Sequence, residues 1–288
     1  MPTMTEIYRR HAVYYETMLG AIFEMYKFSG IMGTGLFELY RENILKAWSW
    51  AIKNSNRHID AAKLCISFAR DRTELLGLRL EPAQLVSRLQ SSVACARRQG
   101  DAQSWGRLLR ELGAAHALNG QVEQALICYL RSEKICRAAS DKAGEAMALS
   151  SQGKAHTHLL AYATATDCLK RSLSIFQEIE LADGEADALN GLGAAQLSLD
   201  LAPQAVESYE ESLAIYRKID NYRGEARALC GLGDARMALA QLKEAEELYT
   251  AALVLFRQLN DQQGETEVLS SIATGGRRAK AIVRNLDA

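Results

Sequence analysis

The side chains in this sequence that could do chemistry are few and poorly spaced for it. His156 and His158 lie two residues apart among helix-forming residues, so they point to different faces of a helix and cannot bind one metal ion together. The adjacent carboxylates of Glu210 and Glu211 are typical of a solvent-facing helix. No His-Glu-x-x-His, Gly-x-Ser-x-Gly or Walker pattern occurs. We therefore expect no enzyme activity, no metal site and no cofactor.

The segment from Ser29 to Gly35 is the nearest approach to a phosphate-binding loop, because it holds three glycines. It lacks the Lys-Ser or Lys-Thr ending of such loops, and no strand precedes it. We predict instead a flexible connector between two helices, which run over about Thr5–Phe28 and Leu36–Lys53.

The six cysteines include no Cys-x-x-Cys pair. This spacing favours small buried apolar side chains in a reducing environment, so we expect a cytoplasmic protein. Cys128 and Cys168 occupy equivalent places forty residues apart, and a disulfide between them remains an alternative.

The composition predicts helices and gives little attraction to polyanions. The 34 basic and 35 acidic residues leave a formal net charge of −1, which favours neither nucleic acid nor an anionic membrane surface. The apolar stretch from Val13 to Leu39 contains four charged residues and is a poor membrane span. Three prolines and no valine-rich alternating stretches indicate an all-α protein.

A repeat of forty residues organises most of the chain. The dipeptide Gly-Glu recurs at this spacing, starting at Gly144, Gly184, Gly224 and Gly264. A small, a large and a second small residue recur in the same register. The triplets are Ala125, Tyr129 and Ser132; Ala165, Leu169 and Ser172; Ala205, Tyr209 and Ser212; and Ala245, Tyr249 and Ala252. Such a pattern indicates stacked units, because one unit cannot bury its apolar face alone.

Each repeat is expected to form two helices, called A and B here. Asp141, Asn221 and Asp261 stand where helix A begins and are expected to cap it. Four repeats cover 101–140, 141–180, 181–220 and 221–260, and a lone helix A that ends the array extends to 275. Residues 276–288 form a basic tail, 61–100 a degenerate repeat, and 1–60 an aromatic-rich helical segment.

The repeat pattern resembles that of a known family. Leu192-Gly193 followed by Ala205 and Tyr209 resembles the tetratricopeptide repeat. The forty-residue length is similar to that of the Pins/LGN spindle-orientation adaptors, kinesin light chains, rapsyn and the bacterial Rap-type peptide receptors. The resemblance covers 101–275 and implies a right-handed α-solenoid of antiparallel helix pairs. It also implies a concave groove lined by the A helices, in which a segment of a protein partner binds.

Helical spacing selects one stripe of A-helix residues for that groove, which we call the A-helix stripe. It consists of the positions five and two before the repeat leucine, and two and six after it. The spindle adaptors typically carry asparagine directly after Leu-Gly, where this chain has Ala114, Lys154, Ala194 and Asp234. The early stripe is basic and the later stripe more acidic, which suits a segment with one acidic and one basic end. The candidate binding residues are Arg107, Arg110, Lys154, Asn190, Arg227 and Asp234.

These features predict a non-catalytic scaffold or adaptor that binds a protein or peptide segment. Two alternatives remain open. The chain could be a Rap-type regulator in which a small peptide gates the superhelix. It could also be a structural subunit of a larger transport or ciliary assembly, docked through aromatic residues around Tyr14, Phe23 and Trp48.

Overall fold

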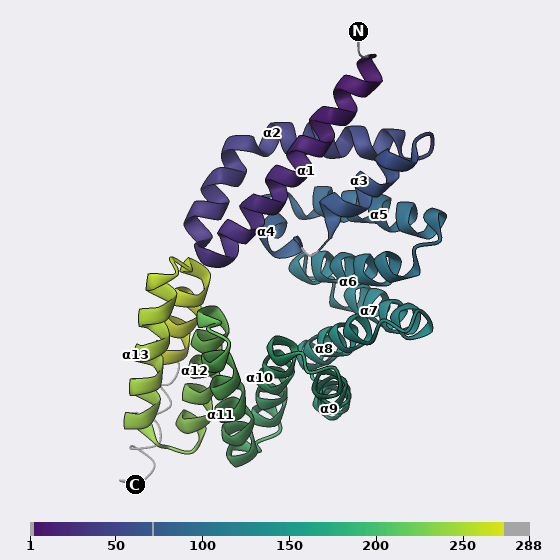
Figure 1. The fold of residues 1–288 in the computed structure, drawn as a ribbon. Coiled ribbons are helices and arrows are strands. Elements are labelled where there is room, and N and C mark those ends of the chain that lie inside the picture. Colours follow the sequence, from purple (N-terminus) through teal and green to yellow (C-terminus); the bar gives the residue numbers. More distant parts are fainter. Residues whose placement is uncertain (1–2, 71, 274–288) are drawn as a thin grey trace. The chain divides into compact units, whose positions relative to one another are not determined.

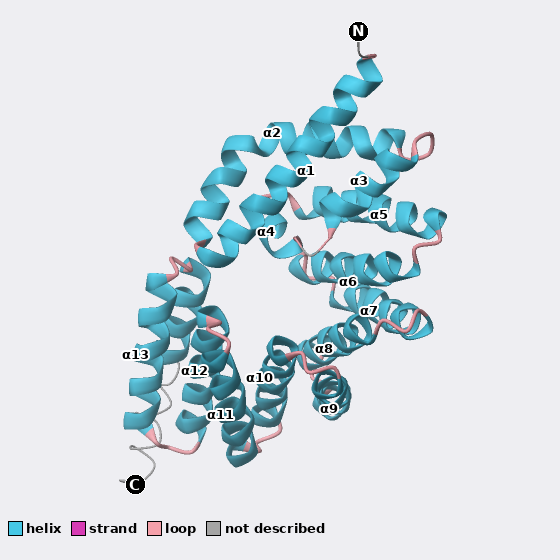
Figure 2. Cartoon of the chain, in the orientation of Figure 1, coloured by secondary structure: helices cyan, strands magenta, loops and turns pink. Residues whose placement is uncertain are grey.

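The structure is a computed structural model that describes residues 3–70 and 72–273. Within these ranges every regular element is a helix, as expected (Figure 1; Figure 2). The basic tail lies outside the described residues. The helices are α1 (Met4–Phe28), α2 (Gly30–Asn54), α3 (Ile59–Ala69), α4 (Thr73–Gly77), α5 (Pro82–Gln99), α6 (Ala102–Leu118), α7 (Val122–Ala138), α8 (Lys142–His158), α9 (Tyr162–Glu178), α10 (Ala182–Ser198), α11 (Ala202–Lys218), α12 (Tyr222–Ala238) and α13 (Leu242–Gln258), with a last helix described over 262–273.

The chain forms two compact units, Met1–Ser151 and Gln152–Ala288, called the N-terminal and the C-terminal unit here. Helix α8 crosses the boundary between them. The domain boundaries expected at 60, 100 and 275 stay predictions.

The repeat is visible as helices of constant length joined by constant turns. Each helix from α6 to α13 has 17 residues. Between Gly100 and Asn260, a residue with φ between 52° and 72° recurs every twenty positions and ends the preceding helix. Seven of these left-handed residues are not glycine, among them Leu160 and Ala240. This conformation is typical of helix C-termini and lets the chain reverse within three residues.

The small and large repeat residues meet inside the helix pairs, which confirms the packing expected of the triplets. Ala205 is fully buried and Tyr209 is 4% exposed. A Cβ on Gly193 would lie 2.8 Å from the Tyr209 ring, so the absent side chain provides the space for this ring. The Ser212 hydroxyl donates to the carbonyl of Ala186 on the neighbouring helix at 2.8 Å. Two backbones therefore approach closely at one end of the triplet, and a large side chain fills the gap at the other.

The expected N-caps of the A helices are confirmed. Asp141, Asn221 and Asp261 accept hydrogen bonds from amides three residues later, at 3.1, 2.9 and 3.1 Å. Leu181 is the N-cap residue of α10, and its side chain makes no capping hydrogen bond. The last helix packs Val268, which is fully buried, into the same core as Phe256 and thus covers the end of α13.

The flexible connector expected over Ser29–Gly35 is wrong. Only Ser29 leaves the helical conformation, and α2 begins at Gly30. The glycines serve close packing, because a Cβ on Gly33 would lie 2.4 Å from the backbone of Tyr26 on α1. Glycine here shortens the distance between two helices rather than loosening a loop.

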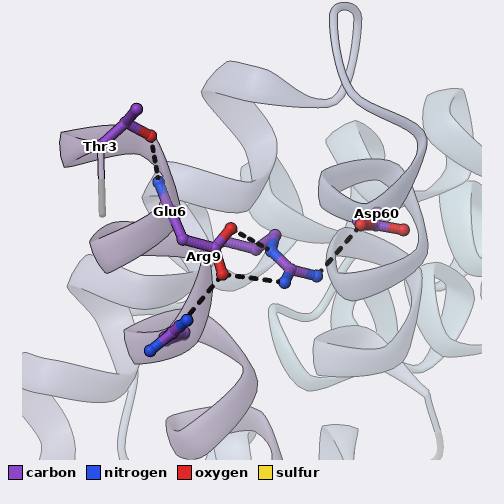
Figure 3. A network of polar contacts seen from close by, with 5 residues as sticks. Thr3, Glu6, Arg9 and Asp60 are labelled. Carbon is purple, nitrogen blue, oxygen red and sulfur yellow. Dashed lines mark hydrogen bonds and ion pairs between the residues drawn. The ribbon is translucent and has the colours of Figure 1, made fainter. Parts of the chain in front are cut away.

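The N-terminal helices have a packed core of their own. The Trp48 ring stacks on Phe68 with 6.0 Å between centroids, and both side chains are fully buried. Outside this core, Arg9 of α1 donates to Asp60 of α3 at 3.2 Å (Figure 3). Arg9 also donates to Glu6, and hydrogen bonds from Arg9 and Arg10 lower the pKa of Glu6 to about 2. The degenerate repeat differs from the regular ones in its helix A, which is split into the short α3 and α4.

Replacing Ala205 by leucine tests the close contact. The larger side chain overpacks a fully buried position, and we expect the free energy of unfolding to fall by ~1–3 kcal/mol. Ala214→Leu on the exposed face of the same helix is the matched control, with little change expected. The measurement is the midpoint of chemical denaturation. Equal midpoints for the two variants would contradict the packing described here.

Replacing a left-handed residue tests the turns. Leu160 has φ 59° and is 71% exposed, so Leu160→Gly relieves backbone strain at little cost in buried surface. We expect unfolding to require ~0.5–1 kcal/mol more free energy. Gly120→Ala should lower the free energy of unfolding, because Gly120 has φ 72°. A Cβ there would meet no other atom within 4 Å, so the effect comes from the backbone alone. Ala214→Gly in the interior of α11 should destabilise as well, which separates relief of strain from glycine itself.

Candidate functional site

The six candidate residues lie on four A helices. Arg107 and Arg110 belong to α6 in the N-terminal unit. Lys154, Asn190, Arg227 and Asp234 belong to α8, α10 and α12 in the C-terminal unit. Each group is described within its own unit.

Arg107 is a structural link as well as a stripe residue. Its Nε and Nη2 donate to the two carboxylate oxygens of Asp141 at 2.8 and 3.0 Å. The Asp141 side chain is 5% exposed and also caps α8 through the Gly144 amide. Arg107 therefore holds the pKa of the Asp141 carboxyl below its ordinary value, in spite of the opposing effect of burial. Removing Arg107 would leave this buried carboxylate without its cation.

Arg110 is engaged in the same unit. Its Nη2 donates to Glu111, the next residue of α6, and the Glu111 side chain is 5% exposed. A buried carboxylate needs such a partner. Arg107 and Arg110 thus both neutralise buried acids, so a ligand would have to share them.

Lys154 makes a different kind of pair in the C-terminal unit. Its Nζ donates to both oxygens of Asp187 at 2.7 Å, which joins α8 to α10. The two side chains are 48% and 40% exposed. A pair so open to water contributes little to stability and can exchange partners at low cost.

Asn190 stands on α10, one turn beyond Asp187. The side chain is half-buried, and its Oδ1 is enclosed by protein but accepts no hydrogen bond from the described residues. Buried polar atoms are nearly always paired in folded proteins, so an unpaired carboxamide oxygen requires an explanation.

Arg227 and Asp234 continue the stripe on α12. Arg227 is exposed. Burial raises the pKa of the Tyr216 hydroxyl, Asp187 raises it further and Arg227 lowers it, so both charges lie near this ring. Asp234 accepts a hydrogen bond of 2.7 Å from the hydroxyl of Tyr249. The acidic part of the stripe is therefore anchored to the large residue of the next helix B.

Sequence reasoning missed that charged residues pair between successive A helices. Besides the two pairs already described, Asn221 donates to Asp183 at 2.7 Å, and Arg223 contacts Asp261 at 3.1 Å. The three charge pairs join residues 34, 33 and 38 positions apart, a little less than one repeat. A search for opposite charges at this spacing would have found them, but not the contact of the uncharged Asn221 with Asp183.

The cysteines form no disulfide. None of the six is disulfide-bonded, Cys128 and Cys168 included. Arg98 donates to the sulfur of Cys95 at 3.3 Å, and a hydrogen bond from Cys65 lowers the pKa of the Cys95 thiol. Cys95 is 1% exposed, so its sulfur is inaccessible to a macromolecular substrate. On the stripe itself, burial raises the pKa of Cys230 to about 12, which keeps this thiol protonated.

Residues 3–70 and 72–273 contain neither a membrane-spanning helix nor a cluster of metal ligands. No helix there combines the length and apolar character needed to cross a membrane. Among the same residues, no cluster of three or more histidines, cysteines, aspartates or glutamates could hold a metal ion.

Comparison with solved structures gives the fold. BtubC from P. vanneervenii superposes with a TM-score of 0.61 at 17% identity, covering 75% of this chain and 90% of that one. A Rap protein in complex with competence and sporulation factor has a TM-score of 0.63 at 12% identity, covering 98% and 91%. Aspartyl phosphate phosphatase F from Bacillus subtilis has a TM-score of 0.64 at 10% identity, covering 100% and 84%. At these identities the likeness concerns the fold alone.

Comparison of sequences matches part of the chain to one family. No curated protein matches this chain as a relative. The family model described as tetratricopeptide repeat matches residues 184–258, which include α11, α12 and α13. The likeness to Pins/LGN adaptors and rapsyn stays a prediction. Residues 184–258 thus resemble tetratricopeptide repeats, and the described part of the chain folds as an all-α solenoid of antiparallel helix pairs.

Proposed function

We propose that the C-terminal unit is a non-catalytic interaction module that binds a segment of a protein partner along its A-helix stripe. The tetratricopeptide match lies in this unit, and repeats of this kind generally serve protein interaction. The segment would lie across α8, α10 and α12 and contact Lys154, Asn190, Arg227 and Asp234.

The observation that carries this proposal is the carboxamide of Asn190. The Asn190 oxygen is enclosed, so the half-buried side chain has to turn outward before its oxygen or its nitrogen can reach a peptide backbone, and no hydrogen bond to that oxygen opposes this turn. A peptide group offers the matching donor and acceptor. Binding would satisfy a polar group that the unbound protein leaves unpaired, which favours association.

The charges around Asn190 suit a segment with both signs. The exposed pair of Lys154 and Asp187 lies one helix away from the exposed Arg227. An acidic residue of the partner can take Lys154 or Arg227, and a basic residue can take the released Asp187. Because the existing pair is well solvated, this exchange costs little. In the N-terminal unit, the binding of a partner segment by Arg107 and Arg110 stays a prediction.

The double variant Asn190→Ala and Arg227→Ala tests the proposal. Peptides are first selected from a displayed random library on the full-length chain, and their affinities are then measured by titration calorimetry. We expect the double variant to bind at least ~2 kcal/mol more weakly, about thirtyfold. Helicity should stay unchanged, because alanine favours helix.

Gln204→Ala with Lys218→Ala is the matched control, since both residues are exposed on helix B α11. This variant should bind like the parent chain. If the control loses affinity and the stripe variant does not, the partner binds to the B helices and the proposal is wrong.

A peptide-gated regulator is the second candidate. The Rap protein and phosphatase F structures cover 98% and 100% of this chain, whereas BtubC covers 75%. The Rap structure is a complex with competence and sporulation factor, and by analogy we infer that a small peptide is a reasonable ligand for this chain.

Hydrogen exchange separates a gated regulator from a passive scaffold. A selected peptide is added to the full chain, and amide protection is measured along it. A gated regulator should change protection in α1 and α2 as well as on the stripe. Changes confined to the C-terminal unit would favour the scaffold.

A further inference from the structure

A cleft of about 950 Å³ lies in the N-terminal unit and is lined by α5, α6 and α7. Helix α6 forms its floor with Trp105 and Leu109, and α5 and α7 form its two walls. Both walls pack on α6. None of the lining residues is acidic, and four are basic.

The cleft coincides with a break in the repeat. In the other repeats, the second residue of the Gly-Glu dipeptide accepts a hydrogen bond from a residue eight positions earlier. Arg137 donates to Glu145 at 2.7 Å, and Arg217 donates to Glu225 at 2.8 Å. The same contact recurs twice more. Gln177 donates to Glu185 at 3.0 Å, and Arg257 donates to Glu265 at 2.9 Å.

In the first repeat this glutamate is replaced by Trp105. The cation of the pair remains, because Arg97 occupies the equivalent donor position and lies over the Trp105 ring at 5.9 Å from its centroid. The substitution exchanges a carboxylate for an aromatic surface, and among the described residues Arg97 then makes no ion pair. Both changes make the cleft a better receptor for an anionic and apolar ligand.

Two more cations stand on the opposite wall. Arg131 and Lys134 of α7 are exposed, and neither makes an ion pair within the described part of the chain. The residues equivalent to Lys134 in the later repeats are Ser174, Ala214 and Val254. The charge of Lys134 is therefore specific to this repeat, whereas Arg131 has a basic equivalent in Arg171 of the next repeat and none in the later two, which carry Glu211 and Ala251.

The spacing of the lining residues fits a helix as the occupant. The α5 wall uses positions 90, 93, 94 and 97, and the α7 wall uses positions 131, 134, 135 and 138. Each series is one face of its helix, so the cleft is a groove between two helices, a shape into which a third helix can pack. Between these two walls, Trp105, Leu109 and Ile135 offer apolar surface.

We propose that this cleft binds an acidic amphipathic helix of a partner protein. The apolar face of that helix would pack on Trp105, Leu109 and Ile135, and its carboxylates would pair with Arg97, Arg131 and Lys134. This is helix-in-groove recognition, with charge complementarity that selects acidic partners. The site is independent of the stripe proposed above, because it uses other residues in the other unit.

A nucleic acid is the competing anionic ligand, and the cleft suits it less well. Single-stranded nucleic acids bind through several aromatic side chains on which successive bases stack. Trp105 is the one aromatic residue that lines this cleft, and the remaining apolar surface is aliphatic. The net charge of −1 also gives no general attraction to polyanions.

Fluorescence anisotropy with the full-length chain tests the proposal. The probe is a fluorescein-labelled synthetic 18-residue peptide with leucine at i, i+3, i+4 and i+7 spacing and glutamate at the flanking positions. One comparison peptide carries lysine in place of glutamate, and a second contains two central prolines that prevent a helix. A labelled single-stranded oligonucleotide is the fourth probe. We expect saturable binding of the acidic helical peptide, weakened by salt, and at least tenfold weaker binding of the other three.

Two variants and one control locate the site. Trp105→Glu restores the residue found in the other repeats and should pair with Arg97, so we expect a folded protein with at least tenfold weaker binding. Arg131→Glu with Lys134→Glu alters only exposed side chains and should weaken binding equally. Lys170→Glu with Lys243→Glu changes the formal charge by the same amount at exposed positions on α9 and α13, and should bind like the parent.

Circular dichroism of every variant shows whether helicity is retained. Loss of binding in both cleft variants, with helicity intact and the control unaffected, supports the proposal. It is overturned by absence of saturable peptide binding, by full binding in Arg131→Glu with Lys134→Glu, by equal loss in the control, or by tighter binding of the oligonucleotide.

Discussion

The close approach of helices A and B at small residues is the constraint on which the rest of the structure depends. Gly193 and Ala205 allow two backbones to meet, and Tyr209 fills the space beside them. Because the contact recurs every forty residues, it fixes the length of each helix and the place of each turn. Turns in a left-handed conformation are strained for leucine or alanine, yet they persist at these positions. The packing between helices therefore outweighs the local backbone preference.

Once the contacts repeat, every A helix presents the same positions to solvent, and the side chains there are free to vary. Some of these side chains form pairs between neighbouring repeats. Arg107 with Asp141 is largely enclosed, whereas Lys154 with Asp187 is open to water. The first pair belongs to the stability of the array, since breaking it would leave a buried charge. The second pair contributes little to stability, because water screens it. Burial thus separates the charges that the fold requires from those that it does not.

The periodic features could be predicted from sequence, and the others could not. The buried triplets and the caps at Asp141 and Asn221 could be predicted from spacing. Each of these positions occurs in several repeats, and the same type of residue recurs there. The segment around Gly33 occurs once, and its glycines suggested a loop although they serve a close helix contact. The interhelical charge pairs were missed because each links different positions of two repeats. The sequence alone predicted which residues belong to the stripe. It did not predict which of their charges already form ion pairs within the protein.

Departures from the repeat carry the remaining information about function. A position occupied by glutamate in four units and by Trp105 in one is not required by the fold to be tryptophan, since the array forms with either. The neighbouring Arg97 keeps its place and loses its carboxylate partner. An exposed cation beside an aromatic ring gains little within the unbound chain. Both residues gain more when a ligand removes water from them and supplies an anion. A regular array therefore makes its own irregularities interpretable, because the equivalent positions show what stability alone requires.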